Sequence, residues 1–169
     1  MRLSEVRNQI KRRLQAAGIE SYEYETWVLI EYGLGIERQD YFMDPDASIG
    51  KEDLARLDGM VSQRERRRPL QYITGEAGFM DYTFLVNEHV LIPRQDTESL
   101  LEYTIKEIRD RKKHKDEDEG EDRGASDRLK ILDLCTGSGC IGLSLKKMLP
   151  RAHLTLSDVS PQALVTARA

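Results

Sequence analysis

The sequence has few cysteines, few aromatic residues and no long apolar run. Its two cysteines, Cys135 and Cys140, are too few for a disulfide framework, so we expect a reducing, cytoplasmic environment. No apolar stretch approaches the roughly 20 residues that cross a bilayer, and the N-terminus lacks the apolar core of a signal peptide. The 26 basic and 30 acidic residues leave a net charge of −4, which gives the whole chain no long-range attraction to nucleic acid. We therefore expect neither a membrane protein nor direct nucleic-acid binding.

The three histidines also lack the spacing of metal ligands. His89, His114 and His153 lie far apart in the sequence, and none is paired with either cysteine. Structural metal sites usually draw their ligands from closely spaced His and Cys pairs. We expect no metal centre.

Helical periodicity dominates the first 75 residues. Apolar side chains recur every three or four residues in three segments, namely 4–17, 21–34 and 51–68. Ser4 is the expected N-cap of the first helix and Gly18 its stop, while residues 44–50 read as a connector. Three short amphipathic helices can bury one small core, with Trp27 in it. We expect residues 1–75 to form a helical N-terminal domain.

The spacing changes to that of short strands after residue 75. Residues 78–80 and 83–86 flank Asp81 and Tyr82, which predicts a β-hairpin with a tight turn. Residues 90–92 are a further extended stretch. A helix capped by Asp96 or Thr97 is then expected.

A strongly charged segment follows this helix. Residues 110–128 contain eight acidic and six basic side chains. Such a composition cannot bury enough apolar surface to offset its ordering entropy. We therefore expect a flexible, solvated loop, with a charged docking tail as the alternative.

The last 40 residues alternate between short strands and helices. The expected strands are residues 129–134 and 153–157, and the expected helices are residues 140–149 and 161–169. This β-loop-α-β-α order is that of the first half of a doubly wound, Rossmann-like α/β sheet. We expect residues 76–169 to hold the hairpin and this incomplete half-fold.

The loop after the first of these strands has the glycine spacing of a nucleotide site. Gly137, Gly139 and Gly142 follow the pattern G-x-G-x-x-G between a strand and a helix, where glycine lets the backbone approach a ligand closely. Asp158 ends the next strand, where a carboxylate can accept both hydroxyls of a ribose. A cofactor that contains ribose is expected to bind here. The alternative is a purely structural turn with a capping aspartate.

The position of Asp133 bears on which cofactor this is. Its carboxylate lies near the end of the strand, where it would repel a pyrophosphate and attract a cation. S-adenosylmethionine has a ribose, an ammonium group and a sulfonium, and it has no phosphate. The sequence therefore favours S-adenosylmethionine, with an NAD-dependent Rossmann oxidoreductase as the alternative.

Three short segments carry a more specific resemblance. They are Pro-Leu-Gln-Tyr-Ile-Thr-Gly at 69–75, Val-Leu-Ile-Pro-Arg at 90–94 and Asp-Val-Ser at 158–160. With the glycine loop, they resemble the release-factor glutamine N5-methyltransferase family (PrmC/HemK), a group of class I S-adenosylmethionine-dependent enzymes. The resemblance runs along the whole chain. The helical first third is similar to the substrate-docking domain of that family.

The resemblance implies transfer of a methyl group from S-adenosylmethionine to a glutamine side-chain amide. In this family the glutamine belongs to the Gly-Gly-Gln motif of peptide-chain release factors, which are then the protein partners. Asp133 would help to hold the α-ammonium group and Asp158 the ribose hydroxyls. The full set of cofactor-binding residues implied is Asp133, Cys135, Thr136, Gly137, Ser138, Gly139 and Asp158.

Three departures from the family pattern matter, and one is Gln95-Asp96 in place of the more usual proline-glutamate after Pro93-Arg94. Cys135 stands where the first glycine of the pattern falls, and a cysteine is tolerable there if its φ is negative. The Asn-Pro-Pro-Tyr motif that holds the substrate glutamine does not occur, and we expect it beyond Ala169. The catalytic residues are therefore unknown. We expect this piece to be inactive alone, so a non-catalytic docking module is a further alternative.

Overall fold

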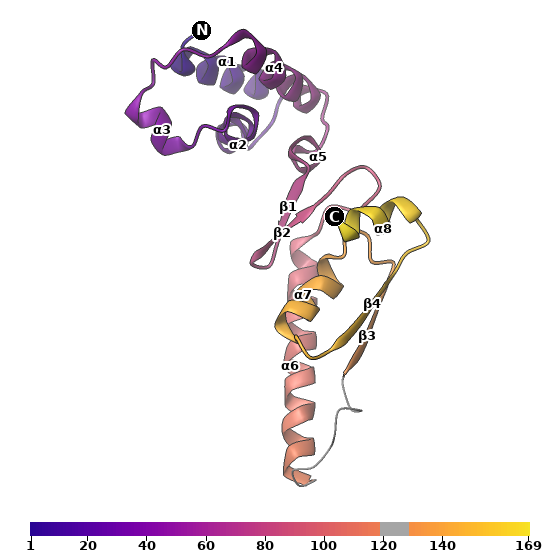
Figure 1. The fold of residues 1–169 in the computed structure, drawn as a ribbon. Coiled ribbons are helices and arrows are strands. Elements are labelled where there is room, and N and C mark those ends of the chain that lie inside the picture. Colours follow the sequence, from indigo (N-terminus) through magenta and orange to yellow (C-terminus); the bar gives the residue numbers. More distant parts are fainter. Residues whose placement is uncertain (119–128) are drawn as a thin grey trace. The chain divides into compact units, whose positions relative to one another are not determined.

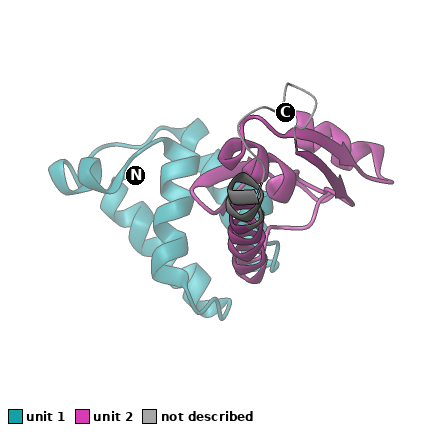
Figure 2. Ribbon diagram, turned by 90° about the horizontal axis from the view of Figure 1, so that it is seen from below, with its two compact units in different colours: residues 1–74 teal, residues 75–169 magenta. Residues whose placement is uncertain are grey.

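The computed structural model describes residues 1–118 and 129–169, with the side chains of residues 1–110 and 129–169. The chain divides into two compact units, unit 1 at Met1–Thr74 and unit 2 at Gly75–Ala169 (Figure 2). Figure 1 gives the order of the helices and strands along the chain. In the described residues, no helix is long and apolar enough to cross a membrane.

Unit 1 is entirely helical. Its helices are α1 (Leu3–Ala16), α2 (Tyr22–Leu34), α3 (Arg38–Met43), α4 (Lys51–Glu65) and α5 (Leu70–Thr74). The three helices expected from the apolar spacing are confirmed as α1, α2 and α4. The short helices α3 and α5 were not predicted, because five or six residues are too few to show a periodic apolar pattern.

The core of unit 1 follows from the spacing of its apolar residues. Val6, Ile10 and Leu14 lie on one face of α1, since residues three or four apart share a helix face. They are buried with residues of α2 and α4 in a single cluster, which also includes Leu3, Ile19, Trp27, Leu29, Ile30, Ile49, Leu57 and Val61. Trp27 is buried, as expected.

The N-terminus of α1 differs from the expectation. Ser4 lies inside the helix and Arg2 is the N-cap, so the prediction of a Ser4 cap is wrong. The Leu3 amide donates to the Ala47 carbonyl at 2.9 Å, and Arg2 bridges Ser48. This pairing holds the first residues extended and fixes the helix start at Leu3. Gly18 does end the helix segment, with a φ of +68°.

Two ion-pair groups join the helices of unit 1. Arg64 of α4 forms a two-pronged pair with Glu25 of α2, with N–O distances of 2.5 and 3.1 Å. Arg13 of α1 bonds Glu65 through two nitrogens, at 2.7 and 2.8 Å, and also Asp58. The Glu65 contact raises the pKa of Arg13, and the same contact lowers the pKa of Glu65.

Unit 2 begins with the expected hairpin. Strand β1 (Glu76–Phe79) runs antiparallel to β2 (Tyr82–Leu85), with Phe79 opposite Tyr82. The turn is therefore Met80 and Asp81, one residue earlier than predicted. Met80 has a φ of +54°, and its amide donates to Glu98 Oε1 at 2.5 Å, which ties the turn to the next helix. Residues 90–92 belong to no described strand, contrary to expectation.

The charged segment is partly helical. Helix α6 runs from Gln95 to Asp118, so the prediction of a flexible loop is wrong for residues 110–118. Residues 119–128 lie outside the described residues. The prediction failed because it weighed only apolar burial, whereas Lys, Arg and Glu are themselves good helix formers.

The remaining elements have the predicted order. They are β3 (Lys130–Leu134), α7 (Cys140–Met148), β4 (His153–Ser157) and α8 (Pro161–Arg168). Strands β3 and β4 are parallel, with Lys130 opposite His153. Helix α7 packs against both strands and against α6 (Figure 1), and side chains from the hairpin, α6 and α7 form the core of unit 2. The glycine loop lies where β3 leads into α7.

Candidate functional site

The candidate site is the loop of residues 135–139 between β3 and α7. Two backbone bonds shape it: the Thr136 amide donates to the Ser157 carbonyl at 3.0 Å, and the Gly139 amide donates to the Thr136 carbonyl at 2.8 Å. The first bond fastens the loop to the end of β4, and the second closes a tight turn. The loop is thereby fixed at the carboxyl ends of two parallel strands, where ligands of open α/β sheets bind.

The Asp133 side chain fixes this loop through hydrogen bonds. It is buried, and its Oδ2 accepts hydrogen bonds from Thr136 Oγ1 at 2.7 Å and from the Gly142 amide at 2.9 Å. One carboxylate oxygen thus links strand β3, the loop and the first turn of α7. Because the free amides at a helix N-terminus attract negative charge, Asp133 also supplies an anion to the start of α7.

Asp158 holds the loop from the side of β4. Its Oδ2 accepts from the Gly137 amide and its Oδ1 from the Ser160 amide, both at 2.9 Å. The Ser160 and Gly137 amides lower the pKa of the Asp158 carboxyl. The carboxylate is therefore ionised at neutral pH and held in one orientation, next to the loop. The remaining lone pairs of its two oxygens can still accept hydrogen bonds from a ligand.

The glycines of the loop have different tasks. Gly137 and Gly139 have φ values of +55° and +80°, in the region that favours glycine. A Cβ on Gly137 would meet no atom within 4 Å, so the space above it is open to a ligand. A Cβ on Gly142 would lie 2.5 Å from Leu156 Cδ2 and 2.8 Å from Asp133 Oδ2. Gly142 therefore lets α7 approach β4 and the Asp133 carboxylate.

Cys135 does not have the backbone that would suit a cysteine. Its φ is +58°, so the condition under which a cysteine would be tolerated there, a negative φ, is not met. The chain must turn sharply where β3 ends, and the loop adopts the conformation of the glycine pattern although a Cβ is present. Left-handed backbone costs an L-residue roughly 1–2 kcal/mol. Cys135 is exposed, so its thiol is free of packing constraints.

The structure thus brings the predicted site residues together, although not all by their side chains. Thr136 is hydrogen-bonded to Asp133, and its neighbour Gly137 is hydrogen-bonded to Asp158. Ser138 is only 4% exposed and lies beside the Cys140 thiol, whose pKa is raised by burial. Ser138 is therefore largely packed inside the loop.

Sequence reasoning missed two contributions to this site. Gly142 belongs to the glycine pattern, but its close packing on Asp133 could have been inferred only from the third glycine's usual place at a helix–strand contact. The Asn87 side chain donates to Thr166 Oγ1 of α8 at 2.9 Å, which ties the segment after the hairpin to α8. No sequence pattern signalled that bond. In the described residues no group of three or more His, Cys, Asp or Glu side chains could hold a metal ion.

Two protein families match this chain. Residues 5–75 match the family described as PrmC N-terminal domain, and residues 123–169 match the methyltransferase small domain. Release factor glutamine methyltransferases are similar along most of the chain. The one from Flavobacterium psychrophilum is 39% identical and covers 89% of this chain, and the one from Geobacter sulfurreducens is 34% identical and covers 92%. That from Koribacter versatilis is 34% identical over the full chain.

The chain is therefore similar to release factor glutamine methyltransferases in both of its units. The resemblance found in the sequence is thereby confirmed. The chain spans about half the length of the curated relatives it matches, at 47%, 49% and 55% of these three proteins. The match to the PrmC N-terminal domain falls on unit 1, and the match to the methyltransferase small domain covers β3 through α8.

Proposed function

We propose that the protein represented by this chain methylates peptide-chain release factors. The reaction is the transfer of a methyl group from S-adenosylmethionine to the N5 amide nitrogen of the glutamine in a Gly-Gly-Gln motif. The similarity to release factor glutamine methyltransferases supports the substrate class, and the geometry of the glycine loop supports the cofactor. The reaction belongs to translation, which takes place in the cytoplasm.

The arrangement of Asp133 carries the choice of cofactor. Its carboxylate already accepts a hydrogen bond from the Gly142 amide in the first turn of α7. In a dinucleotide site that helix N-terminus binds the pyrophosphate, so a buried carboxylate there opposes a phosphate group. A cofactor with a ribose and cationic groups fits better. This favours S-adenosylmethionine over NAD.

The residues of the loop divide the binding between them. Asp158 is ionised and is oriented by two amides. Its carboxylate would accept hydrogen bonds from the two ribose hydroxyls. The backbone from Cys135 to Gly139 would lie along the cofactor, with the open space over Gly137 as its seat. Asp133 would act on the ammonium group through its negative charge and on the loop through its hydrogen bonds. Thr136 keeps that carboxylate in place.

The bound cofactor supplies an electrophilic methyl group, so the protein must position a weak nucleophile. In the transfer the N–C bond forms, the S–C bond breaks and the amide nitrogen gives up a proton. Holding the two reactants in line provides most of the rate in such a reaction. The residues of this chain bind and orient; we assign none of them a catalytic role. Residues 1–75 are proposed to dock the substrate and residues 76–169 to hold the cofactor.

Calorimetric titration of S-adenosylmethionine into the 169-residue chain, with NAD as the control, tests the proposal. We expect saturable binding of S-adenosylmethionine alone, and a sharp loss of affinity in Asp158→Ala. Glu102→Ala, which removes an exposed carboxylate of α6, is the matched control and should bind normally. Binding of NAD instead would point to an oxidoreductase. Binding of neither would leave this chain with a docking role only.

A further inference from the structure

Residues 31–46 form an acidic segment of unit 1. Residues 31–46 contain five acidic side chains and one basic side chain, so their net charge of −4 equals that of all 169 residues. The acidic side chains are Glu31, Glu37, Asp40, Asp44 and Asp46. The other residues therefore sum to a formal charge of zero. This segment covers the end of α2, the helix α3 and the turn after it.

The same segment exposes apolar side chains next to the buried Trp27. Phe42 is 74% exposed and Met43 is 86% exposed, and α3 has no buried residue. The Phe42 ring lies 5.5 Å from the Tyr41 ring and 6.3 Å from the buried Trp27 ring, and Tyr41 meets Trp27 edge-on at 5.1 Å. Core packing accounts for Trp27 and Tyr41. It does not account for the exposure of Phe42 and Met43, which gives α3 two adjacent apolar side chains that a partner could bury.

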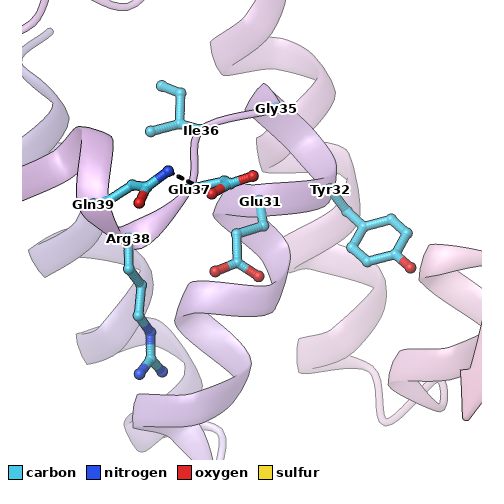
Figure 3. A pocket seen from close by; sticks show the side chains of 7 residues that line it. All are labelled: Glu31, Tyr32, Gly35, Ile36, Glu37, Arg38 and Gln39. Carbon is cyan, nitrogen blue, oxygen red and sulfur yellow. Dashed lines mark hydrogen bonds between the residues drawn. The ribbon is translucent and has the colours of Figure 1, made fainter. Parts of the chain in front are cut away.

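An open hollow of about 800 Å³ lies where the end of α2 leads into α3 (Figure 3). It is lined by Glu31, Tyr32, Gly35, Ile36, Glu37, Arg38 and Gln39. Glu37 accepts a hydrogen bond from Gln39 at 2.9 Å, drawn as the dashed line. Arg38 lies four residues before Phe42, hence on the same face of α3, and its guanidinium lies 5.2 Å from the Trp27 ring. Arg38 therefore links the hollow, which it lines together with Glu31 and Glu37, to the face of α3 that carries Phe42.

We propose that residues 31–46 are a docking surface for a basic segment of the release factor. This inference rests on the proposed function and adds to it the surface that recognises the substrate and the chemistry it selects. Phe42 and Met43 are the apolar anchors, and Glu31 and Glu37 receive lysine or arginine side chains. Aromatic anchors carry much of the energy of an interface, and complementary charge steers the encounter. The sign of the charge disfavours nucleic acid and anionic lipid as occupants.

Calorimetric titration of an unmethylated bacterial release factor into the full chain tests the docking surface. We expect Phe42→Ala to weaken binding about tenfold or more, since it removes an interface anchor. Asp44→Lys should weaken it several-fold, with a smaller effect at high salt because exposed charges are screened. Two exposed positions elsewhere are the matched controls: Tyr103→Ala in α6 and Glu20→Lys before α2 should leave affinity unchanged. Circular-dichroism melts should show that all four variants remain folded.

The outcomes separate this inference from the proposed function. If the wild-type chain binds the release factor and Phe42→Ala and Asp44→Lys bind equally well, the docking surface is wrong and the proposed function stands. If Asp44→Lys binds more tightly, the basic character of the partner segment is wrong. If the wild type binds S-adenosylmethionine but no release factor, the docking surface and the substrate assignment both fail.

Discussion

Both units have an apolar core, but their buried polar groups differ in what they do. In unit 1 the buried residues are mostly apolar, with Leu14, Leu29 and Ile30 almost inaccessible to solvent, and the buried Thr26 bonds only within its own helix. In unit 2 strand β3 leaves Leu132 and Leu134 at 59% and 65% exposure, and it buries Asp133 between them. The buried groups of unit 1 therefore serve stability, whereas the buried polar groups of unit 2 hold a loop in one conformation. Substitutions of buried residues in each unit test this difference.

The largest loss of stability is expected from removing the charged side chain that is buried in unit 1. Glu25 is 5% exposed and pairs with Arg64 through two hydrogen bonds. Glu25→Ala leaves the guanidinium without its partner, which should lower the free energy of unfolding by about 3 kcal/mol or more. Urea denaturation followed by the fluorescence of Trp27, the one tryptophan in the sequence, measures this.

Asp58→Ala is the matched control for the buried pair. Asp58 bonds Arg13, but its side chain is 63% exposed, so its loss should cost less than about 1 kcal/mol. The double variant Glu25→Leu with Arg64→Met should recover much of the stability, since two apolar groups replace two charges. Equal losses for Glu25→Ala and Asp58→Ala would show that burial does not set the strength of these pairs.

The next effect concerns the packing of the loop in unit 2. Gly142→Ala places a methyl group 2.5 Å from Leu156 and 2.8 Å from the Asp133 carboxylate. Helix α7 must then move away from the sheet, and we expect a loss of about 1–3 kcal/mol. Faster amide hydrogen exchange over residues 133–145 reports it. In unit 1, Gly59→Ala meets no atom within 4 Å and should stabilise α4 by about 0.5–1 kcal/mol.

The sequence was informative where one local rule decides the structure. Apolar spacing located α1, α2 and α4 and predicted the burial of Trp27. It did so because apolar residues three or four apart lie on one face of a helix, which is then the face that is buried. It also located β3, β4 and the glycine loop between β3 and α7. The sharing of Asp133 between Thr136 and Gly142 joins residues nine apart through space. That contact depends on how α7 crosses the sheet, which the sequence alone does not specify.

Two of the failures have the same physical origin. Ser4 is a good capping residue, but pairing of Arg2 with Ser48 moved the start of α1. Met80 entered the hairpin turn with a positive φ, because strand register and the bond to Glu98 outweighed its own preference. In each case a tertiary contact overrides a local preference.

Replacing Cys135 by glycine should stabilise unit 2. The residue has a φ of +58°, and glycine removes a cost of roughly 1–2 kcal/mol for left-handed backbone. Glycine also gains freedom in the unfolded chain, which offsets about half of this. We expect a net gain of about 0.5–1 kcal/mol, measured as a higher midpoint of thermal unfolding. Cys135→Ala keeps a Cβ and should show no gain; equal gains for both variants would attribute the effect to the thiol.

The smallest effect at neutral pH is expected from the titration of Asp158. Amides of Ser160 and Gly137 lower the pKa of this carboxyl, so the folded state favours the ionised form. Its contribution to stability is complete above the ordinary pKa of about 3.9 and is lost as the pH falls through the lower folded value. The midpoint difference between the wild type and Asp158→Asn should therefore stay constant from pH 8 to pH 5 and shrink below about pH 4. A difference that already shrinks between pH 7 and pH 5 would mean that another titrating group, and not this carboxylate, orders the loop.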